Sequence, residues 1–332
     1  MRLEEFPSPG NKKDKMISRV KALFLLAFLT GIFVFMRGFM MQQPQLQDAS
    51  PSVESCHCEK CFPEDDQWFV KRFDKSVEPF LSTKYNLPVD AFNWWRGLQY
   101  EKRNYDVYNK TVERLFQIFP PSPDVLKPSR EHCRRCAVVG NSGNLKGSRY
   151  GPLINAHEII IRMNTGKTEG YEADVGSRTT HRIMYPESAI DLDNSTHLVL
   201  FPFKIQDIEW LNKAFTTGFH GSSYVPVRAK IKANKDLVMV VNPAFMKYVH
   251  QTWLDKKGRY SSTGFMALVL ALHICDEVDV FGFGADKDGN WSHYWEQLKN
   301  KRLRTGVHPG SQEYEAILRL AKLLIIKFYR GW

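Results

Sequence analysis

The segment from Cys136 to Asn164 constrains the fold of this chain more than any other stretch. It reads as a short apolar strand over 137–139, a glycine-rich turn, a connecting stretch expected to be helical, and a second strand over 159–161. The turn carries Gly140, Gly143 and Gly147. This order of strand, turn, helix and strand is typical of the first β-α-β unit of a nucleotide-binding fold.

The unit departs from the dinucleotide-binding fingerprint. Gly140-Asn-Ser-Gly143 breaks the G-x-G-x-x-G spacing. The second strand also ends at Asn164, where an NAD-binding protein carries the acid that holds the ribose. The sequence therefore predicts a nucleotide ligand other than NAD.

Strand and helix candidates alternate through the rest of the chain. A helical pattern at 112–119 precedes the unit, and further strands are expected at 196–201, 237–241, 277–281 and 324–328, with helices at 243–256 and 263–275. Such alternation favours a mainly parallel sheet covered on both faces. The expected fold class is therefore α/β, with a Rossmann-like, mainly parallel sheet flanked by helices.

An uncharged apolar run over 22–36 follows a basic tail. As a helix these positions would span roughly 22 Å, and extension to residue 41 would match a bilayer core of about 30 Å. We interpret the run as a signal anchor whose basic flank stays in the cytosol; a cleaved signal peptide and a buried core helix are the alternatives. The expected organisation is a cytoplasmic tail over 1–21, a transmembrane helix over 22–41, a stem over 42–55 and a luminal domain over 56–332.

All six cysteines follow the predicted anchor: Cys56, Cys58, Cys61, Cys133, Cys136 and Cys275. An even number in an oxidising compartment predicts three disulfides, with fifteen pairings open. Zinc is the alternative, because Cys56-x-Cys58-x-x-Cys61 and Cys133-x-x-Cys136 have ligand-like spacing.

Sequons and charge add weaker indications. Asn109 and Asn194 begin sequons that predict luminal glycosylation, and a third begins at Asn290, among residues of the expected active site. The net charge is +10, from 46 basic and 36 acidic residues. Outside the tail this charge is spread and not clustered, so we expect anionic ligands and no nucleic-acid groove.

Three segments could carry chemistry. Arg259 to Gly264 precedes an apolar helix, where hydroxyls and amides favour an anion or sugar oxygens, although a plain helix cap explains the same residues. The glycines between Phe281 and Asp286 suit a strand-end turn that a ligand approaches closely. His293 and His308 could transfer protons near neutral pH, although each alone could be structural.

Two acid pairs fit the short motif of metal-dependent sugar transferases. They are Asp191-x-Asp193 and Asp286-x-Asp288, and the first precedes an expected strand when it should end one. The chain has no H-E-x-x-H, Walker or G-x-S-x-G motif.

Taken together, four ordered segments resemble the animal sialyltransferase family. The long motif corresponds to Cys136 to about Ser188, including VVGNSGNL and ADVGSRTTHRIMYPES, and the short motif to Asn242 to Asp286. The third corresponds to His293-Tyr-Trp-Glu296, and the very short motif to His308 with Glu313. The resemblance covers essentially the whole expected luminal region.

Within that family, three features look most like the β-galactoside α-2,3-sialyltransferases of types 1 and 2, which act on Galβ1,3GalNAc. They are Cys56-His-Cys58, the paired Trp94-Trp95 with Gln99, and Cys133-Arg-Arg-Cys136. The resemblance implies a variant glycosyltransferase A-type fold in a single luminal domain. It also implies a bridge between Cys136 and Cys275, with Cys56 to Cys61 and Cys58 to Cys133 as the remaining pairs.

The resemblance also assigns roles to residues of this sequence. His308 would be the general base toward the galactose 3-hydroxyl, His293 would stabilise the departing phosphate, and Gln99 would contact the acceptor. The donor would be bound by Asn141, Ser142, Asn164, Tyr224, Tyr260, Ser262, Thr263, Gly264 and Gly284. Ser292 and Ser261 depart from the family pattern, where relatives carry histidine and proline.

The function that the resemblance implies is inverting, metal-independent transfer of sialic acid from CMP-sialic acid to Galβ1,3GalNAc on O-glycans or glycolipids. It implies a single-pass type II protein of the Golgi membrane that needs no cofactor. The chemistry is sound on independent grounds, because an oxocarbenium-like transition state needs one group to activate the nucleophile and another to stabilise the leaving group. The alternatives are a noncatalytic luminal glycan- or nucleotide-binding protein and a metal-dependent transferase of another nucleotide sugar.

Overall fold

The computed structural model describes residues 30–31, 58, 62, 65–123, 125, 131–286, 289–297 and 306–332. The chain divides into two units, Met1–Glu54 and Ser55–Trp332, and the fold below is that of the second. The predicted tail, anchor and stem lie outside the described residues, except for Thr30 and Gly31, which are helical. Among the described residues, no helix has the length and apolar character needed to span a membrane.

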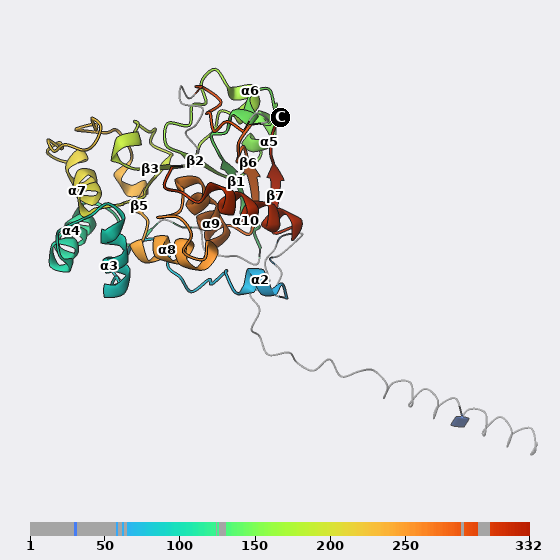
Figure 1. Cartoon of the computed structure of the whole chain (residues 1–332), viewed down its shortest axis with the longest axis horizontal. Coiled ribbons are helices and arrows are strands. Elements are labelled where there is room, and N and C mark those ends of the chain that lie inside the picture. The colour runs from blue at the N-terminus through green and yellow to red at the C-terminus, as the bar shows by residue number, and fades with distance from the viewer. Residues whose placement is uncertain are drawn as a thin grey trace, which may run out of the picture. The chain divides into compact units, whose positions relative to one another are not determined.

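Seven strands in the described part of the chain form one parallel sheet (Figure 1). In spatial order they are β5 (Val238–Val240), β4 (His197–Leu200), β3 (His181–Met184), β2 (Ile159–Met163), β1 (Arg135–Val139), β6 (Glu277–Phe281) and β7 (Ile326–Tyr329). The predicted α/β fold with a mainly parallel sheet is confirmed.

The order of the strands creates a crevice beside β1. The chain steps from β1 outward to β5 and then crosses back to place β6 and β7 on the other side of β1. In open parallel sheets, ligands bind outside the carboxyl ends of the strands at such a reversal. The turns that follow β1, β2 and β6 therefore meet at one edge of the sheet.

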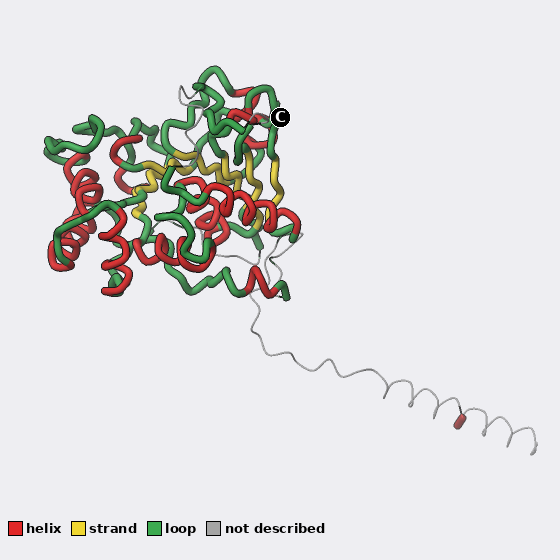
Figure 2. Tube along the Cα trace, viewed as in Figure 1, coloured by secondary structure: helices red, strands yellow, loops and turns green. Residues whose placement is uncertain are grey.

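The central strand is buried on both faces. Cys136 and Val138 belong to the larger hydrophobic core, and Ala137 and Val139 belong to a smaller core on the other face. Burial on both sides explains why β1 is a continuous apolar run without alternation. Figure 2 shows the strands running side by side through the middle of this unit, between helices.

Helices cover both faces of the sheet (Figure 1). The larger core includes residues of α8 (Pro243–Tyr248), α9 (Thr263–Ile274) and α10 (Gly310–Lys322), and the smaller core includes residues of α5 (Gly151–Asn155) and α6 (Glu172–Val175). The remaining α-helices are α2 (Gln67–Val70), α3 (Val89–Leu98), α4 (Tyr105–Ile118) and α7 (Ile205–Ala214), where α3 packs on α8 and α4 on α7. Helix α9 lies against β1, β2 and β6.

Single turns complete the regular structure. They are the 3₁₀ turns η1 (Gly143–Leu145), η2 (Pro186–Ser188) and η3 (Lys235–Leu237) and the π-helical turn η4 (Val249–Trp253). The connection from β1 to β2 is helical as expected, but it consists of η1 and the five-residue α5 and contains no long helix.

The sequence analysis missed one strand and did not resolve the inside of one helix. Strand β3 was not predicted, because it begins with His181 and Arg182, which do not read as apolar strand residues. Arg182 is nevertheless buried, and its guanidinium donates to backbone carbonyls of Asn164 and Gly166. The helix predicted over 243–256 ends at Tyr248 and continues as the π-helical turn η4.

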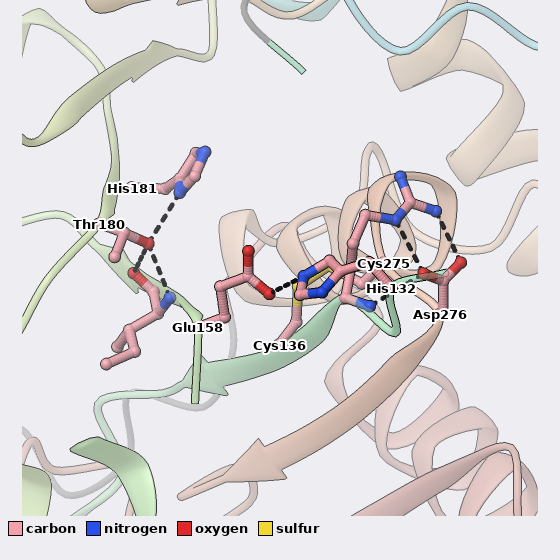
Figure 3. The surroundings of a disulfide bond; sticks show 9 residues. His132, Cys136, Glu158, Thr180, His181, Cys275 and Asp276 are labelled. Atoms are coloured by element: carbon pink, nitrogen blue, oxygen red, sulfur yellow. Dashed lines mark hydrogen bonds and ion pairs between the residues drawn. A yellow bond between two sulfur atoms is a disulfide. The ribbon is translucent and has the colours of Figure 1, made fainter. Parts of the chain in front are cut away.

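Two of the three expected disulfides lie among the described residues. Cys136 bonds Cys275, and Cys58 bonds Cys133. Figure 3 shows the first bond between β1 and the end of α9, close to His132 and Glu158. The pairing predicted for Cys56 with Cys61 falls outside the described residues.

The disulfides also bear on the zinc alternative. Cys133 and Cys136 belong to different disulfides, so their sulfur atoms do not form the ligand pair that their spacing suggested. The spacing was misleading because Cys136 lies in β1, where it is buried against α9.

Candidate active site

A cavity of about 220 Å³ opens where the ends of β1, β2 and β6 meet the first residues of α9 and α10. Its lining includes most of the predicted site residues: Asn141, Ser142, Asn164, Ser262, Thr263, Gly264, Gly284, His293 and His308. The fold thus brings together residues that lie up to 167 positions apart in the sequence, from Asn141 to His308.

The turn after β1 is fixed by close contact with the turn after β6. A Cβ atom on Gly140 would lie 2.3 Å from the carbonyl oxygen of Gly282, so only glycine fits there. The Ser142 hydroxyl donates to the carbonyl of Gly284 at 2.8 Å, and the Asn141 amide donates to the carbonyl of Met163 at 3.3 Å. The Asn-Ser pair therefore joins the ends of three strands.

Asn164 occupies the turn after β2 in a left-handed backbone conformation, with φ of 54°. Asparagine tolerates that region better than most residues. Its side-chain oxygen accepts a hydrogen bond from the Ser188 hydroxyl at 2.9 Å. The amide is therefore oriented at the edge of the cavity before any ligand binds.

The start of α9 is held by a buried carboxylate from α10. Ser262 is the N-cap, and its backbone N–H and hydroxyl both donate to Glu313 at 2.6 Å. Burial raises the pKa of Glu313, and the bonds from Ser262 and the nearby charge of His308 oppose that rise. Glu313 thus connects the anion-favouring helix terminus to the region of His308.

His308 lies just before α10 and packs against Tyr260. The two ring centroids are 5.0 Å apart at an angle of 82°, and Nδ1 lies 3.1 Å from the Tyr260 carbonyl oxygen. A carbonyl oxygen only accepts, so this bond places the proton on Nδ1 and the lone pair on Nε2. Tyr260 itself is not part of the cavity lining but positions the histidine that is.

His293 belongs to a loop that docks on the turn after β1. It forms an antiparallel bridge with Ser142, and Tyr294 N–H donates to the Asn141 carbonyl at 3.1 Å. Its Nδ1 lies 2.6 Å from a carboxylate oxygen of Glu296, and its ring stacks on Trp295 with centroids 4.5 Å apart. The carboxylate and the indole therefore hold the imidazole ring in one orientation.

The described members of the acid pairs, Asp191, Asp193 and Asp286, are not among the residues that line this cavity. Asp191 pairs with Arg228 at 3.1 Å, and Asp193 accepts four hydrogen bonds from the backbone and hydroxyls of Ser195 and Thr196 at 2.8–2.9 Å. Asp286 accepts from the backbone of Asn290 at 2.7 Å, and Asp288 lies outside the described residues. Asp193 and Asp286 therefore stabilise turns.

The comparisons with known proteins decide the family. The description "Glycosyltransferase family 29 (sialyltransferase)" matches residues 80–324. This chain belongs to glycosyltransferase family 29. The resemblance drawn from the four motifs is confirmed, and the chain is a glycosyltransferase.

Curated members of family 29 align over most of the chain. CMP-N-acetylneuraminate-beta-galactosamide-alpha-2,3-sialyltransferase 1 of Sus scrofa is 47% identical over 282 residues, covering 83% of this chain and 82% of the relative. The type 1 protein of Homo sapiens is 43% identical and covers 94% of this chain and 98% of the relative. The type 2 protein of Rattus norvegicus is 44% identical, with 89% and 85% covered.

A solved structure of family 29 matches as well. A crystal structure of a mammalian sialyltransferase in complex with Gal-beta-1-3GalNAc-ortho-nitrophenol aligns with a TM-score of 0.76 and 46% identity, covering 84% of this chain and all of that chain. The fold expected from the resemblance is therefore that of a solved family member.

Besides Tyr260, two more residues that the family resemblance proposed lie outside the cavity lining. Tyr224 is 70% exposed, in a loop where its ring lies 5.9 Å from the Lys204 ammonium. Gln99 is the half-buried C-cap of α3. Their roles as donor and acceptor contacts remain predictions.

Sequence reasoning missed several aromatic and helical residues of the family 29 cavity. Phe283 lies between the two glycines of the turn after β6, and Trp291 precedes the loop of His293. Helix α10 contributes Gly310, Tyr314 and Ile317, beside Glu313, which the very short motif had already named. Their i, i+3, i+4 and i+7 spacing is the signal that could have identified one helix face.

Proposed function

We propose that this chain transfers sialic acid from CMP-sialic acid to the 3-hydroxyl of the terminal galactose in Galβ1,3GalNAc, on O-glycans or glycolipids. The names of the aligned relatives support the donor, the galactoside acceptor and the α-2,3 linkage. The solved structure with a Gal-beta-1-3GalNAc compound supports the acceptor disaccharide.

The observation that carries this proposal is the presence of two histidines in one cavity with an anion-favouring helix terminus. His293 and His308 line it together with Ser262 and Thr263 at the start of α9. Displacement at the anomeric carbon of a nucleotide sugar needs a base for the incoming hydroxyl and a stabiliser for the departing phosphate. The cavity supplies a candidate for each.

His308 is suited to the role of base. With its proton on Nδ1 toward the Tyr260 carbonyl, its Nε2 lone pair can accept the proton of the galactose 3-hydroxyl. The imidazolium that forms is then stabilised by the negative charge of Glu313, which interacts with it electrostatically. This arrangement resembles the way a buried carboxylate supports a catalytic histidine in hydrolases.

His293 is suited to the leaving phosphate. Its bond to Glu296 and its stacking on Trp295 orient the ring, and in the protonated imidazole Nε2–H can donate to a phosphate oxygen. CMP departs as an anion, so it needs a charge-assisted hydrogen bond and no proton. Attack and departure on opposite faces of the anomeric carbon invert its configuration.

We also propose that the reaction needs no metal. The one carboxylate in the described cavity lining is Glu313, and both of its oxygens accept hydrogen bonds from Ser262. The described members of the Asp pairs that could hold a divalent ion are engaged elsewhere: Asp191 with Arg228, and Asp193 and Asp286 in turns. His293 and the helix terminus can supply the stabilisation that a metal supplies elsewhere.

We place the protein in the Golgi membrane as a single-pass type II protein with its catalytic domain in the lumen. The apolar run over 22–36 with its basic flank supports the anchor. The two disulfides support an oxidising compartment. Asn194 is exposed, which suits a glycosylated residue, whereas the sequon at Asn109 lies within α4.

The test is transfer by the purified segment from Cys56 onward, with CMP-sialic acid and Galβ1,3GalNAc in excess EDTA and the product linkage identified. A 3-linked product is expected. Product that requires an added divalent ion would contradict metal independence. Binding of CMP without any product would favour a noncatalytic protein.

A further inference from the structure

An exposed aromatic residue lies against the segment that packs next to the proposed base. Tyr100 follows Gln99 at the end of α3 and is 76% exposed. Its φ of 55° lies in the left-handed region, which is costly for a residue of this size. A backbone outlier at an exposed position near a site is a reason to look for a functional contact.

The Tyr100 ring holds an arginine in place. The Arg259 guanidinium lies 4.5 Å from the ring centroid. Stacking on an aromatic face leaves the N–H donors at the edge of the guanidinium available to another group. In the described part of the chain, no carboxylate forms an ion pair with Arg259.

Backbone contacts fix Arg259 next to the segment that carries the base. Its N–H donates to the carbonyl of Val307 at 3.0 Å. A Cβ atom on Gly258 would lie 2.6 Å from the ring of Pro309, so this glycine packs directly on the residue after His308. The Tyr260 ring, one residue further on, contacts His308. The segment from Gly258 to Tyr260 thus contacts the segment from Val307 to Pro309, and Arg259 is held close to His308.

The charge around Arg259 is positive. Lys256, Lys257 and Arg259 are exposed, and the neighbouring acid, Asp255, is bound by Arg72 at 3.0 Å. On the Tyr100 side, Glu101 is bound by Arg103 at 2.7 Å. The acids nearest in sequence are therefore neutralised, and these three cations are not.

We propose that Arg259, oriented by Tyr100, forms an outer subsite for a carboxylate on the aglycone of the acceptor, namely an acidic residue close to the glycosylated Ser or Thr of a glycopeptide. The inference rests on the proposed function, because the acceptor galactose must reach His308 for its aglycone to pass near Arg259. Three cations within four consecutive positions suit an extended acidic peptide better than a single isolated charge.

The test compares acceptors that differ in aglycone charge alone. In three acceptors Galβ1,3GalNAc is attached to the threonine of a peptide whose flanking residues are Glu, Gln or Lys. A fourth acceptor has a neutral aglycone and carries its carboxylate on an acidic sugar. We expect kcat/KM for the Glu peptide to exceed that for the Gln peptide by about three- to tenfold, the range of a partly exposed Arg–carboxylate contact. The ratio should fall as salt is raised.

Variants test whether Arg259 and Tyr100 cause the preference for the Glu peptide. Arg259→Gln and Tyr100→Asn should bring the Glu-to-Gln ratio close to one, mainly through KM of the acceptor; Asn is chosen because it tolerates the left-handed backbone. Arg259→Lys should keep part of the ratio, since it retains charge but loses the planar fork. Arg114→Gln, an exposed arginine on α4, should leave the ratio unchanged.

Each opposing result has a distinct meaning. A ratio that survives Arg259→Gln overturns the subsite. So does a rise in donor KM that is equal for every acceptor, since it would make Arg259 a contact of the anionic donor. A preference for the acidic sugar but not for the Glu peptide overturns the assignment to a peptide. No product from any acceptor would instead refute the proposed transferase function.

Discussion

At the scale of single residues, the two histidines of the cavity differ in what supports them. His308 faces a backbone carbonyl and a nearby buried carboxylate, whereas His293 binds an exposed carboxylate and stacks on an indole. In the first arrangement Nδ1 lies against a carbonyl oxygen, and in the second it lies against a carboxylate. Substitutions at the two places therefore test different roles in the reaction.

Replacement of the proposed base gives the first prediction. His308→Ala should lower kcat by about 10²- to 10⁴-fold, the usual contribution of a general base. Affinity for CMP-sialic acid should change little, because the base acts in the transition state and not in binding. Turnover and equilibrium binding of CMP measure the two separately. Wild-type turnover in the variant would show that His308 is not the base.

The carboxylate behind His293 gives the second prediction. Glu296→Gln keeps the hydrogen-bonding shape but removes the charge-assisted bond that orients His293, so kcat should fall about tenfold, an effect of about 1.4 kcal/mol. Glu296 is exposed, so the folding stability should be close to that of the wild type. Kinetics with CMP-sialic acid and thermal unfolding of the same sample separate the effect on activity from the effect on stability. A loss of activity that tracks a loss of stability would contradict a catalytic origin.

At the scale of elements, the sequence predicted every described strand except β3, and most of the predicted site residues line the cavity. The residues after β1, β2 and β6 were identified because strand-end turns rich in Gly, Asn and Ser are recognisable locally. Strand β3 was not, because the burial of Arg182 depends on carbonyls of the turn after β2 that local sequence does not reveal. The cavity face of α10 was not identified, because the sequence alone does not show which residue of this helix lines the cavity, and the helical spacing has meaning only relative to such a residue.

The Arg134–Asp276 pair gives an element-scale prediction. Arg134 is buried, and it donates to both carboxylate oxygens of Asp276 at 2.7 and 2.8 Å, beside the disulfide that joins β1 to α9 (Figure 3). Asp276→Asn leaves a buried guanidinium without its counter-charge and should lower the free energy of unfolding by about 3–5 kcal/mol. Chemical denaturation measures this free energy. The double change Arg134→Met, Asp276→Leu should lower the free energy of unfolding by less than Asp276→Asn does. A larger decrease for the double change would contradict this account.

The same pair has a pH dependence of known sign. Burial alone would raise the pKa of Asp276, but the hydrogen bonds and charge of Arg134 outweigh burial and lower it. A carboxyl with a lowered pKa stabilises the fold above its unfolded pKa, and the stabilisation is lost as the pH falls through the folded pKa. The destabilisation by Asp276→Asn should therefore be largest near neutral pH.

At the scale of the whole molecule, a buried histidine pair should limit acid stability. His181 and His197 lie side by side on β3 and β4 with stacked rings 4.4 Å apart. Burial, and then the charge of His197, lower the pKa of His181 from 6.5 to about 3. Between these values the unfolded chain binds a proton that the folded chain does not, so the free energy of unfolding falls as the pH drops.

This effect is measurable by substitution. His181→Phe keeps an aromatic ring on His197 but cannot titrate, so the loss of unfolding free energy from pH 6.5 toward pH 4 should be shallower by up to about 1.4 kcal/mol per pH unit. Urea unfolding at several pH values gives the slope. His220→Gln, at an exposed loop histidine, should leave the wild-type slope intact. An unchanged slope in His181→Phe would place the acid sensitivity elsewhere.

The bond between Cys136 and Cys275, which lie 139 positions apart, closes a covalent ring that contains β2 through β5 and leaves β6, α10 and β7 outside. Closure of so long a loop removes conformational freedom from the unfolded chain, on the order of 5 kcal/mol in the entropic account. The turns of Asn141 and Asn164 and the start of α9 lie within the ring, whereas His293 and His308 come after it. Once oxidised, the chain thus carries these turns in a closed loop, and the two histidines belong to an open C-terminal segment that docks onto it.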